Sequence, residues 1–273
     1  MLPQISVIMP VLNPDPKYFP AAIESVLAQT MPDWELIIVE DPSSRRGADF
    51  LARYPDPRIH HFTNTSRTSL VAQLNRAVDM SSAKYLARLD ADDLAEPHRF
   101  AEQMRVMEAQ PDLGVLGCQM TVIGPEDEVL GVRNYPVGHT EICKAMRRYS
   151  PLPHPGVFLR RAILLEAGGY RYDQIQGAED YELWWRLLKL GVKFSNHPGR
   201  LLRYRIQPDQ TKSKRLREQL LATIHVKKQN WDESFGFFDL VRLSTEKCLL
   251  RLPPALVMRL FVAITYRRNG KSS

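Results

Sequence analysis

The first ninety residues alternate short apolar runs with segments of helical spacing, and this alternation constrains the fold more than any other feature of the chain. Short apolar runs cover residues 4–11, 34–39, 59–63 and 85–89, whereas residues 18–29 and 69–80 place apolar side chains on one helical face. Connections that hold one helix and little else are typical of crossovers between parallel strands. The sequence therefore predicts an α/β fold with a doubly wound, mostly parallel sheet flanked by helices.

Carboxylates stand at the ends of two of these predicted strands. Asp41 follows the second strand closely, and the fourth strand runs directly into Asp90, Asp92 and Asp93. Because parallel strands end at the same edge of a sheet, we expect both groups to face one crevice. Open α/β sheets bind their ligands at such an edge.

The acidic cluster at residues 90–93 admits more than one interpretation. Carboxylates this close repel one another unless a cation lies among them, and hard divalent cations prefer oxygen ligands. A solvated turn that caps the following helix is the alternative. A calcium loop of the EF-hand type is excluded by spacing, because Ala95 and Ala101 occupy the positions that need glycine and glutamate when the loop starts at Asp90.

Composition places the chain among soluble globular proteins, with 44% apolar and 25% charged residues in a length of 273. Its three cysteines, Cys118, Cys143 and Cys248, lie far apart and form no CxxC pair, so neither a disulfide framework nor a zinc site is indicated. No apolar stretch reaches the roughly 18–20 residues that span a bilayer. The apolar run at residues 5–11 is too short for a signal peptide, and we expect a cytoplasmic chain.

The C-terminal part is basic and reads as helical from residue 212 onward. Residues 200–273 contain 16 Lys and Arg against 6 Asp and Glu, a net charge of +10, whereas the whole chain carries +6. Residues 253–268 combine apolar side chains at helical spacing with Arg259, Arg267 and Arg268, which is typical of helices that lie in a membrane interface. An ordinary helix packed on the rest of the chain is the alternative. We expect an anionic membrane surface as a partner, and no nucleic acid, because no nucleic-acid-binding module is recognisable.

Six strings, in order, resemble the motifs of family 2 glycosyltransferases with a GT-A fold. They lie at residues 6–13, 35–41, 85–93, 154–161, 166–170 and 179–183, so the resemblance extends over residues 5–205. It implies a GT-A catalytic domain over residues 1–210, with a nucleotide-sugar half at about 1–112 and an acceptor half at about 113–210. The helical, basic extension then covers residues 211–273.

The resemblance also implies roles for individual residues. Asp41 corresponds to the carboxylate that binds the nucleotide base, usually uracil. Asp90 and Asp92 correspond to the DxD pair, in which the first residue contacts the ribose and the last holds Mn²⁺ or Mg²⁺ on the diphosphate, so both are candidate metal ligands. Asp180 corresponds to the general base of inverting members. Further contacts to the nucleotide-sugar are expected from Pro10, Val11, Asn13, His154 and Glu179.

Structural alternatives remain for some of these residues, and two positions depart from the family pattern. Asp41 can be a turn-former, Asp180 a helix cap, and His154 a packed residue before proline. Glu40 stands where the family more often has a first aspartate, and Gln207 stands where many members have a histidine that completes the metal site.

The sequence thus predicts an inverting glycosyltransferase that moves one sugar per acceptor. The donor is a nucleotide-diphospho-sugar, foremost a UDP-sugar, and the acceptor is a glycan or lipid-linked acceptor in surface polysaccharide or lipopolysaccharide assembly at the inner face of the cell membrane. The QxxRW string of processive synthases is absent. Two alternatives stay open. One is a catalytically degenerate nucleotide-sugar-binding protein. The other is a sugar nucleotidyltransferase, which needs a glycine-rich loop that residues 12–16 lack.

Overall fold

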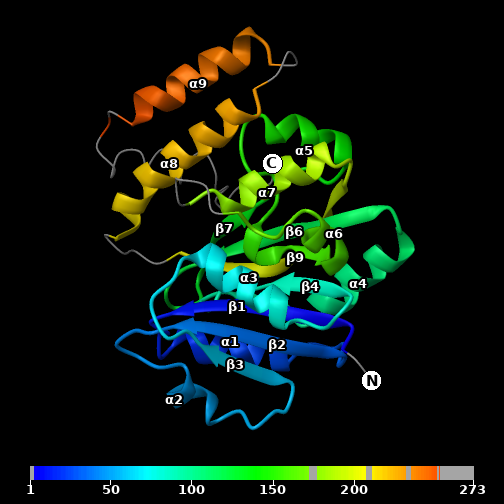
Figure 1. The fold of residues 1–273 in the computed structure, drawn as a ribbon, viewed down its shortest axis with the longest axis vertical. Helices are drawn as coiled ribbons and strands as arrows, with labels where there is room; N and C mark the ends of the chain where they lie inside the picture. Colours follow the sequence, from blue (N-terminus) through cyan, green and yellow to red (C-terminus); the bar gives the residue numbers. More distant parts are fainter. Residues whose placement is uncertain (1–2, 172–176, 207–210, 232–234, 251, 253–273) are drawn as a thin grey trace.

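A central sheet with helices on both faces, and a pair of helices at one end, make up the fold in the computed structural model (Figure 1). The structure describes residues 3–171, 177–206, 211–231, 235–250 and 252.

Within the described residues the sheet has nine strands in the order β3-β2-β1-β4-β8-β6-β9-β5, with β7 added to β6. The strands are β1 (Ile5–Leu12), β2 (Trp34–Asp41), β3 (Ile59–Thr63), β4 (Tyr85–Arg88), β5 (Leu94–Ala95), β6 (Leu113–Ile123), β7 (Val129–Arg133), β8 (Phe158–Arg160) and β9 (Lys193–Arg205).

The first part of the sheet is parallel, as the alternation of strands and helices predicts. β1 lies between β2 and β4 and runs parallel to both, and β3 continues the parallel order on β2. The register pairs Leu12 with Asp41 and Ile8 with Arg88. The carboxyl ends of β2 and β4 therefore point toward the same edge, which confirms the expected convergence of the two strand ends.

The second part of the sheet is mixed. β8 is antiparallel to both β4 and β6, and β5 is antiparallel to β9. β6 and β9 run parallel along their whole length, with register shifts around Gln119. Through this arrangement the last residues of β9 reach the acidic segment that follows β4.

Helices cover both faces of the sheet. They are α1 (Tyr18–Leu27), α2 (Ala48–Leu51), α3 (Leu70–Met80), α4 (Arg99–Ala109), α5 (His139–Met146), α6 (Arg161–Glu166), α7 (Glu179–Lys189), α8 (Thr211–Gln229) and α9 (Phe237–Leu249), with a 3₁₀ turn η1 (His154–Gly156). Alternate side chains of β1 enter two separate apolar clusters: Val7 and Met9 join α1 and α4, whereas Ile8 joins α3, α5 and α7.

Local chemistry explains the predicted helix at residues 69–80. The Ser69 hydroxyl accepts a hydrogen bond from the Ala72 N–H at 3.1 Å, so Ser69 caps α3. Val71, Leu74 and Val78 are buried on one side of the helix. That side packs on β1 and β2, which places the start of α3 beside the end of β2.

β6 is one continuous strand of 11 residues. The sequence reading missed α5, β5 and β9. β9 contains Pro198 and Gly199 and has an irregular burial pattern, so neither strand periodicity nor β-propensity marks it. Its structure comes from pairing with β6, a tertiary effect that a local pattern does not contain.

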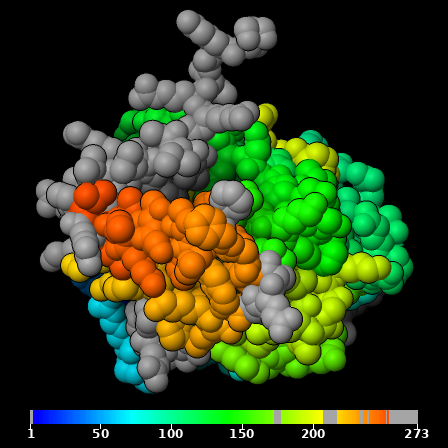
Figure 2. All heavy atoms as spheres, turned by 90° about the horizontal axis from the view of Figure 1, so that it is seen from above, coloured from blue at the N-terminus to red at the C-terminus, as the bar shows by residue number. Residues whose placement is uncertain are grey.

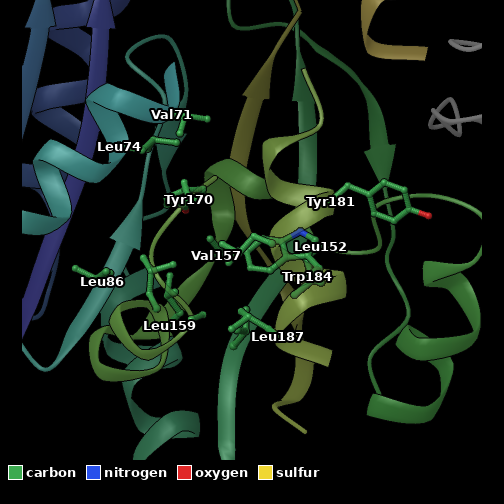
Figure 3. Close-up of a cluster of buried hydrophobic side chains, with 14 of the residues drawn as sticks. Val71, Leu74, Leu86, Leu152, Val157, Leu159, Tyr170, Tyr181, Trp184 and Leu187 are labelled. Atoms are coloured by element: carbon green, nitrogen blue, oxygen red, sulfur yellow. The ribbon is translucent and has the colours of Figure 1, made fainter. Parts of the chain in front are cut away.

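A cluster of large apolar side chains fixes α7 against the sheet. Trp184 is fully buried, and its ring meets the rings of His154 and Phe194 edge-on at centroid distances of 6.2 and 6.4 Å. Figure 3 shows Trp184 with Leu152, Val157 and Leu187 in this cluster. The start of α7 is therefore held by packing behind it.

The C-terminal helices α8 and α9 lie side by side above α7 (Figure 1). Ala222 and Val226 of α8 are part of the apolar cluster that contains α7. The buried Lys227 ammonium lies 2.6 Å from Glu246 of α9 and ties the two helices together. The predicted amphipathic segment at residues 253–268 lies outside the described residues. Nowhere in the described chain does a helix have the length and apolar character needed to cross a bilayer.

Candidate active site

The loops after β1 and β2 are joined to each other at the sheet edge. Pro10 and Val11 are buried in β1, and Asn13 follows with a left-handed backbone, φ 53°. The Asn13 N–H donates to the Ser43 hydroxyl at 3.1 Å, and the Ser44 hydroxyl donates to the Asn13 Oδ1 at 2.8 Å. These bonds give the end of β1 a fixed backbone, in the position expected for one wall of a nucleotide pocket.

Asp41 lies at the centre of a hydrogen-bond network. Its carboxylate accepts from the Asn64 side chain at 2.6 Å, from the Thr68 N–H at 2.7 Å and from the Thr68 hydroxyl at 2.9 Å. Burial raises the pKa of Asp41, but hydrogen bonds from Asn64, Thr68 and Gln73 outweigh burial and hold the pKa below its ordinary value. Asp41 is thus a fixed anion that also fastens the loop before α3.

Glu40, which departs from the family pattern, has its carboxylate engaged by two neighbouring groups. Its Oε1 accepts from the Gly47 N–H at 2.7 Å, and its Oε2 lies 2.7 Å from the His61 Nε2. A side chain at Gly47 would collide with this carboxylate, because a Cβ there would lie 2.8 Å from the Glu40 Oε2. Glu40 therefore anchors the loop after β2 and does not point into the edge beside Asp41.

The three carboxylates of the acidic segment after β4 differ in their exposure to solvent. Asp90 and Asp92 are part-exposed, and the Asp90 Oδ1 lies 2.5 Å from the Arg88 Nη2. Asp93 is fully buried, and its Oδ1 accepts from the Arg205 N–H of β9 at 2.8 Å. Burial, followed by the charges of Asp92 and Asp90, raises the pKa of Asp93 well above its ordinary value.

A divalent cation suits Asp90 and Asp92 if a ligand supplies the remaining oxygens. In the described part of the chain no three His, Cys, Asp or Glu side chains are grouped so that they could hold a metal ion. Mg²⁺ is usually held by one or two carboxylates together with substrate phosphates, and this donor set has that composition. Gln207, at the family's histidine position, lies outside the described residues.

Glu179 and Asp180 open α7, where the helix dipole favours negative charge. The Ser150 hydroxyl donates to the Asp180 Oδ2 at 2.8 Å. Burial raises the pKa of Asp180, although the Ser150 hydroxyl and the Arg88 guanidinium act in the opposite direction. Burial and the neighbouring charge of Asp180 raise the pKa of Glu179 to about 7. Two acidic groups with raised pKa values therefore share one helix end.

His154 combines packing with a place at the site. It is 8% exposed, and its Nε2 lies 3.1 Å from the Tyr170 hydroxyl. Burial, aided by the charge of Arg88, lowers the pKa of His154 well below its ordinary value, so the ring is neutral near pH 7. Tyr170 itself is held by Asn75, which bonds its N–H and its carbonyl at 2.8 Å each.

A small pocket of about 140 Å³ opens beside Asp180. Asp180, His154, Ser150 and Arg133 contribute polar groups to it, and the remaining lining residues are Met120, Tyr135, Leu152, Pro153, Pro155 and Tyr204. Among the described residues that line this pocket, Asp180 is the only carboxylate. The structure thus brings the predicted residues Asp180 and His154 together around a space that can hold a small polar group.

Several residues at the site were not predicted from the sequence. Ser150 and Arg133 carry no motif, and their place depends on loops and on β7. Arg88 was not among the predicted site residues, although its position two residues before Asp90 was a usable signal. Trp184, four residues after Asp180 on α7, is fully buried behind the pocket and belongs to the core.

Comparisons with known proteins bear on the family and the fold of the chain. The family model described as "Glycosyl transferase family 2" matches residues 6–167. An O-antigen biosynthesis glycosyltransferase of Escherichia coli, WbnJ, is 32% identical over 221 residues, which cover 79% of this chain and 85% of the relative.

Two solved structures share the fold. S. aureus TarS 1–349 in complex with UDP-GlcNAc superposes with a TM-score of 0.65 at 15% identity, covering 96% of this chain and 73% of that one. The mannosyltransferase PcManGT of Pyrobaculum calidifontis, in complex with GDP-Man and Mn²⁺, gives a TM-score of 0.62 at 15% identity, covering 100% of this chain and 77% of that one. At such identities the likeness establishes the GT-A fold alone.

Proposed function

Because the chain belongs to glycosyl transferase family 2 and is a glycosyltransferase, we propose that it moves one sugar from a UDP-sugar to a hydroxyl of a glycan or lipid-linked acceptor, with inversion. The observation that carries this proposal is the placement of Asp180, a half-buried carboxylate that accepts a hydrogen bond from the Ser150 hydroxyl, in the wall of a pocket that His154 also lines. The proposal includes the division predicted from the sequence, with a catalytic domain at residues 1–210 and a helical extension at residues 211–273.

Donor binding is assigned to the carboxyl ends of β1, β2 and β4. Asp41, ionised and fixed by its donors, accepts from the nucleotide base, and the backbone of Pro10, Val11 and Asn13 lines the base pocket. Asp90 and Asp92 hold Mn²⁺ or Mg²⁺ together with the donor diphosphate. The cation, when bound, stabilises the negative charge that develops on the leaving diphosphate.

Proton transfer is assigned to Asp180. An acceptor hydroxyl within hydrogen-bond reach of its carboxylate loses its proton as it attacks the sugar. Ser150 keeps the carboxylate oriented, and neutral His154 borders the same space. Because Asp180 is the one carboxylate among the described residues that line the pocket, a single displacement is favoured over a double displacement, which needs a second, nucleophilic group. A single displacement inverts the anomeric centre.

Calorimetric titration with UDP and Mn²⁺ tests the donor site. We expect UDP to bind in the presence of Mn²⁺ and to bind at least about tenfold more weakly to Asp92→Ala, because the variant lacks one oxygen ligand of the cation. Asp112→Ala, which removes an exposed carboxylate that pairs with Lys193, serves as the matched control and should bind as wild type does.

The same titration also distinguishes a UDP-sugar transferase from a transferase with another donor and from a binding protein without turnover. Absence of binding by any nucleoside diphosphate with metal present would overturn the proposal. Preference for GDP over UDP would keep the transferase and change the donor. Tight UDP binding with no release of UDP from any UDP-sugar would identify a nucleotide-sugar-binding protein without turnover.

We further propose that the enzyme works at the inner face of the membrane, on surface polysaccharide or lipopolysaccharide precursors. The exposed face of α9 supports this partner: Phe237, Leu240 and Val241 are 73%, 52% and 46% exposed. Arg242 and Lys247 are exposed on the same helix. Figure 2 shows α8 and α9 together forming an outer surface of the molecule. Apolar side chains beside basic ones are typical of helices that bind anionic interfaces.

Vesicle flotation tests the membrane partner. We expect the full chain to float with vesicles that contain phosphatidylglycerol and not with phosphatidylcholine vesicles, and to be released by salt, which screens surface charge. Phe237→Ser should reduce flotation, whereas Val129→Ser, at a similarly exposed apolar residue of β7, should not. If wild type stays in the vesicle-free fraction to the same extent with both lipids, the proposed membrane partner is overturned.

A further inference from the structure

The pocket beside Asp180 also contains a cation. Arg133 is the last residue of β7, and its side chain lines the same pocket. The guanidinium lies over the ring of Tyr135, 4.7 Å from the ring centroid, where a cation and an aromatic face attract each other. Within the described chain the Arg133 guanidinium forms no hydrogen bond and no ion pair. No described residue therefore occupies its N–H groups.

Other arginines of this protein that lie over an aromatic ring also use their N–H groups to hold the fold together. Arg58, over a tryptophan ring, donates to the Asp56 carboxylate at 2.7 Å. Arg160, over a tyrosine ring, donates to two backbone carbonyls at 2.9 and 2.8 Å. Arg133 has the support of a ring without a bond of this kind, which favours a ligand as the partner of its guanidinium.

The aromatic platform under Arg133 is fixed by a buried amide. Gln119 of β6 is 5% exposed; its Oε1 accepts from the Tyr135 N–H at 2.5 Å, and its Nε2 donates to the Tyr135 carbonyl at 3.1 Å. The pairing of β6 with β7 sets Arg133 opposite Met120, which also lines the pocket. The backbone on both sides of the guanidinium is thus held in place before any substrate binds, which lowers the cost of ordering it on binding.

Arg133 and Asp180 place opposite charges on one space of about 140 Å³ without pairing with each other. A ligand that matches both offers a hydroxyl to the carboxylate and an anionic group to the guanidinium, whose planar fork fits carboxylates and phosphates. Neither Asp90 nor Asp92 is among the described residues that line this pocket. Because the donor diphosphate is assigned to those two residues, the acceptor is the substrate that occupies the space beside Asp180.

We propose that Arg133 determines acceptor specificity: it binds a carboxylate or phosphate group of the acceptor sugar while the acceptor hydroxyl meets Asp180. This inference rests on the proposed function in its role for Asp180. It deepens that function, because it names the acceptor as an anionic glycan or sugar phosphate.

Ligand-detected NMR titration tests this proposal, with UDP and Mg²⁺ present so that the donor site is filled. Methyl β-D-glucuronide and methyl β-D-glucoside 6-phosphate are the anionic probes, and methyl β-D-glucoside is their neutral match. We expect at least one anionic probe to bind wild type at least about fivefold more tightly than the neutral glycoside, because charge-assisted hydrogen bonds are the stronger ones. The anionic probe that wild type prefers identifies the acceptor group as a carboxylate or a phosphate.

Three variants assign this preference to one side chain. Arg133→Met keeps an apolar stem and removes the charge, so the anionic and neutral probes should bind it about equally. Arg133→Lys should keep part of the preference, since an ammonium carries the charge without the planar fork. Arg203→Met is the matched control: Arg203 of β9 is also part-exposed but is not among the residues that line the pocket, so the wild-type preference should remain.

The proposal is overturned if wild type binds both anionic probes no more tightly than the neutral one, or if the preference persists in Arg133→Met. If Arg133→Met does not fold, Arg133→Gln, which is also uncharged, takes its place. A titration with UDP-glucuronic acid separates donor from acceptor: weaker binding of this nucleotide-sugar to Arg133→Met, with unchanged binding of the anionic probes, would overturn the acceptor assignment and place the anionic group on the donor.

Repeating the probe titrations without UDP and Mg²⁺ separates this inference from the proposed donor. Failure of wild type to bind UDP would refute the donor, whereas the comparison of anionic with neutral probes would still decide the role of Arg133.

Discussion

Asp180→Asn is expected to slow sugar transfer by about 10²- to 10⁴-fold, the range typical of losing a general base, while donor binding stays close to wild type. The amide keeps the shape of the side chain and can still meet the Ser150 hydroxyl, but it cannot take a proton. Release of UDP from the donor measures the rate, and UDP–Mn²⁺ calorimetry measures donor binding. Asp112→Asn, far from the pocket on the surface, is the control.

The proposed role of Asp180 as general base predicts the pH dependence of the rate. Burial raises the pKa of Asp180 above its ordinary value of 3.8, and a general base reacts as the carboxylate. The rate should therefore be constant well above this raised pKa and fall as pH drops through it. Removing the Ser150 hydroxyl removes a hydrogen bond that lowers the pKa, so Ser150→Ala should move the acid limb to higher pH.

Two outcomes would contradict the role of Asp180. One is Asp180→Asn retaining most of the wild-type rate. The other is an acid limb that stays in place in Asp180→Asn, since the variant has no Asp180 carboxyl left to titrate. Loss of UDP–Mn²⁺ binding in Asp180→Asn would instead mean that the substitution disturbed the donor site, and the kinetic comparison would be repeated with Asp180→Ser.

Trp184→Ala is expected to lower the free energy of unfolding by about 3–5 kcal/mol, the usual cost of removing a fully buried large aromatic side chain. Trp184 is 0% exposed and packs against His154 and Phe194. Its indole N–H has no partner in the described structure, so lost packing and the resulting cavity account for the effect. Urea denaturation monitored by circular dichroism measures it.

Matched substitutions sharpen this measurement. Trp184→Phe keeps much of the packing and should cost clearly less than alanine. Trp231→Ala removes the same side-chain volume from a residue that is 37% exposed and should also cost less. A loss below about 1 kcal/mol for Trp184→Ala would contradict the assigned packing, since values that small are typical of surface positions.

The N-terminal half of the fold could be predicted because local patterns and tertiary structure agree there. Residues 59–63 read as a strand and form β3 with the same limits, and residues 69–80 carry both a cap and an apolar face. Parallel strands buried on both faces give apolar runs that are visible in the sequence. Carboxylates at the ends of such runs then indicate the ligand edge.

The second half could not be predicted to the same extent, because long-range pairing decides it. β5 has two residues and exists only through its pairing with β9, and β9 carries no strand pattern of its own. As a result Arg205, which bonds the buried Asp93 through its backbone N–H, had no visible link to the acidic segment.

The acidic segment itself was only partly understood from the sequence. Grouping Asp90, Asp92 and Asp93 as equivalent carboxylates around a cation did not anticipate that Asp93 is buried and that Asp90 is paired with Arg88. Burial differs among neighbours on one short segment because successive side chains point in different directions. Composition and spacing do not contain that information.

The pairing of β4 with β8 has a consequence for how enzymes of this architecture diversify. Within the sheet, strands β1–β4 meet the rest of the molecule through three residue pairs, Tyr85–Arg160, Leu86–Leu159 and Ala87–Phe158. Under the proposed division into a donor half and an acceptor half, a recombination event between related genes at this seam would exchange acceptor specificity and conserve donor specificity. Such an event would require rematching one three-residue strand and the helix contacts across it.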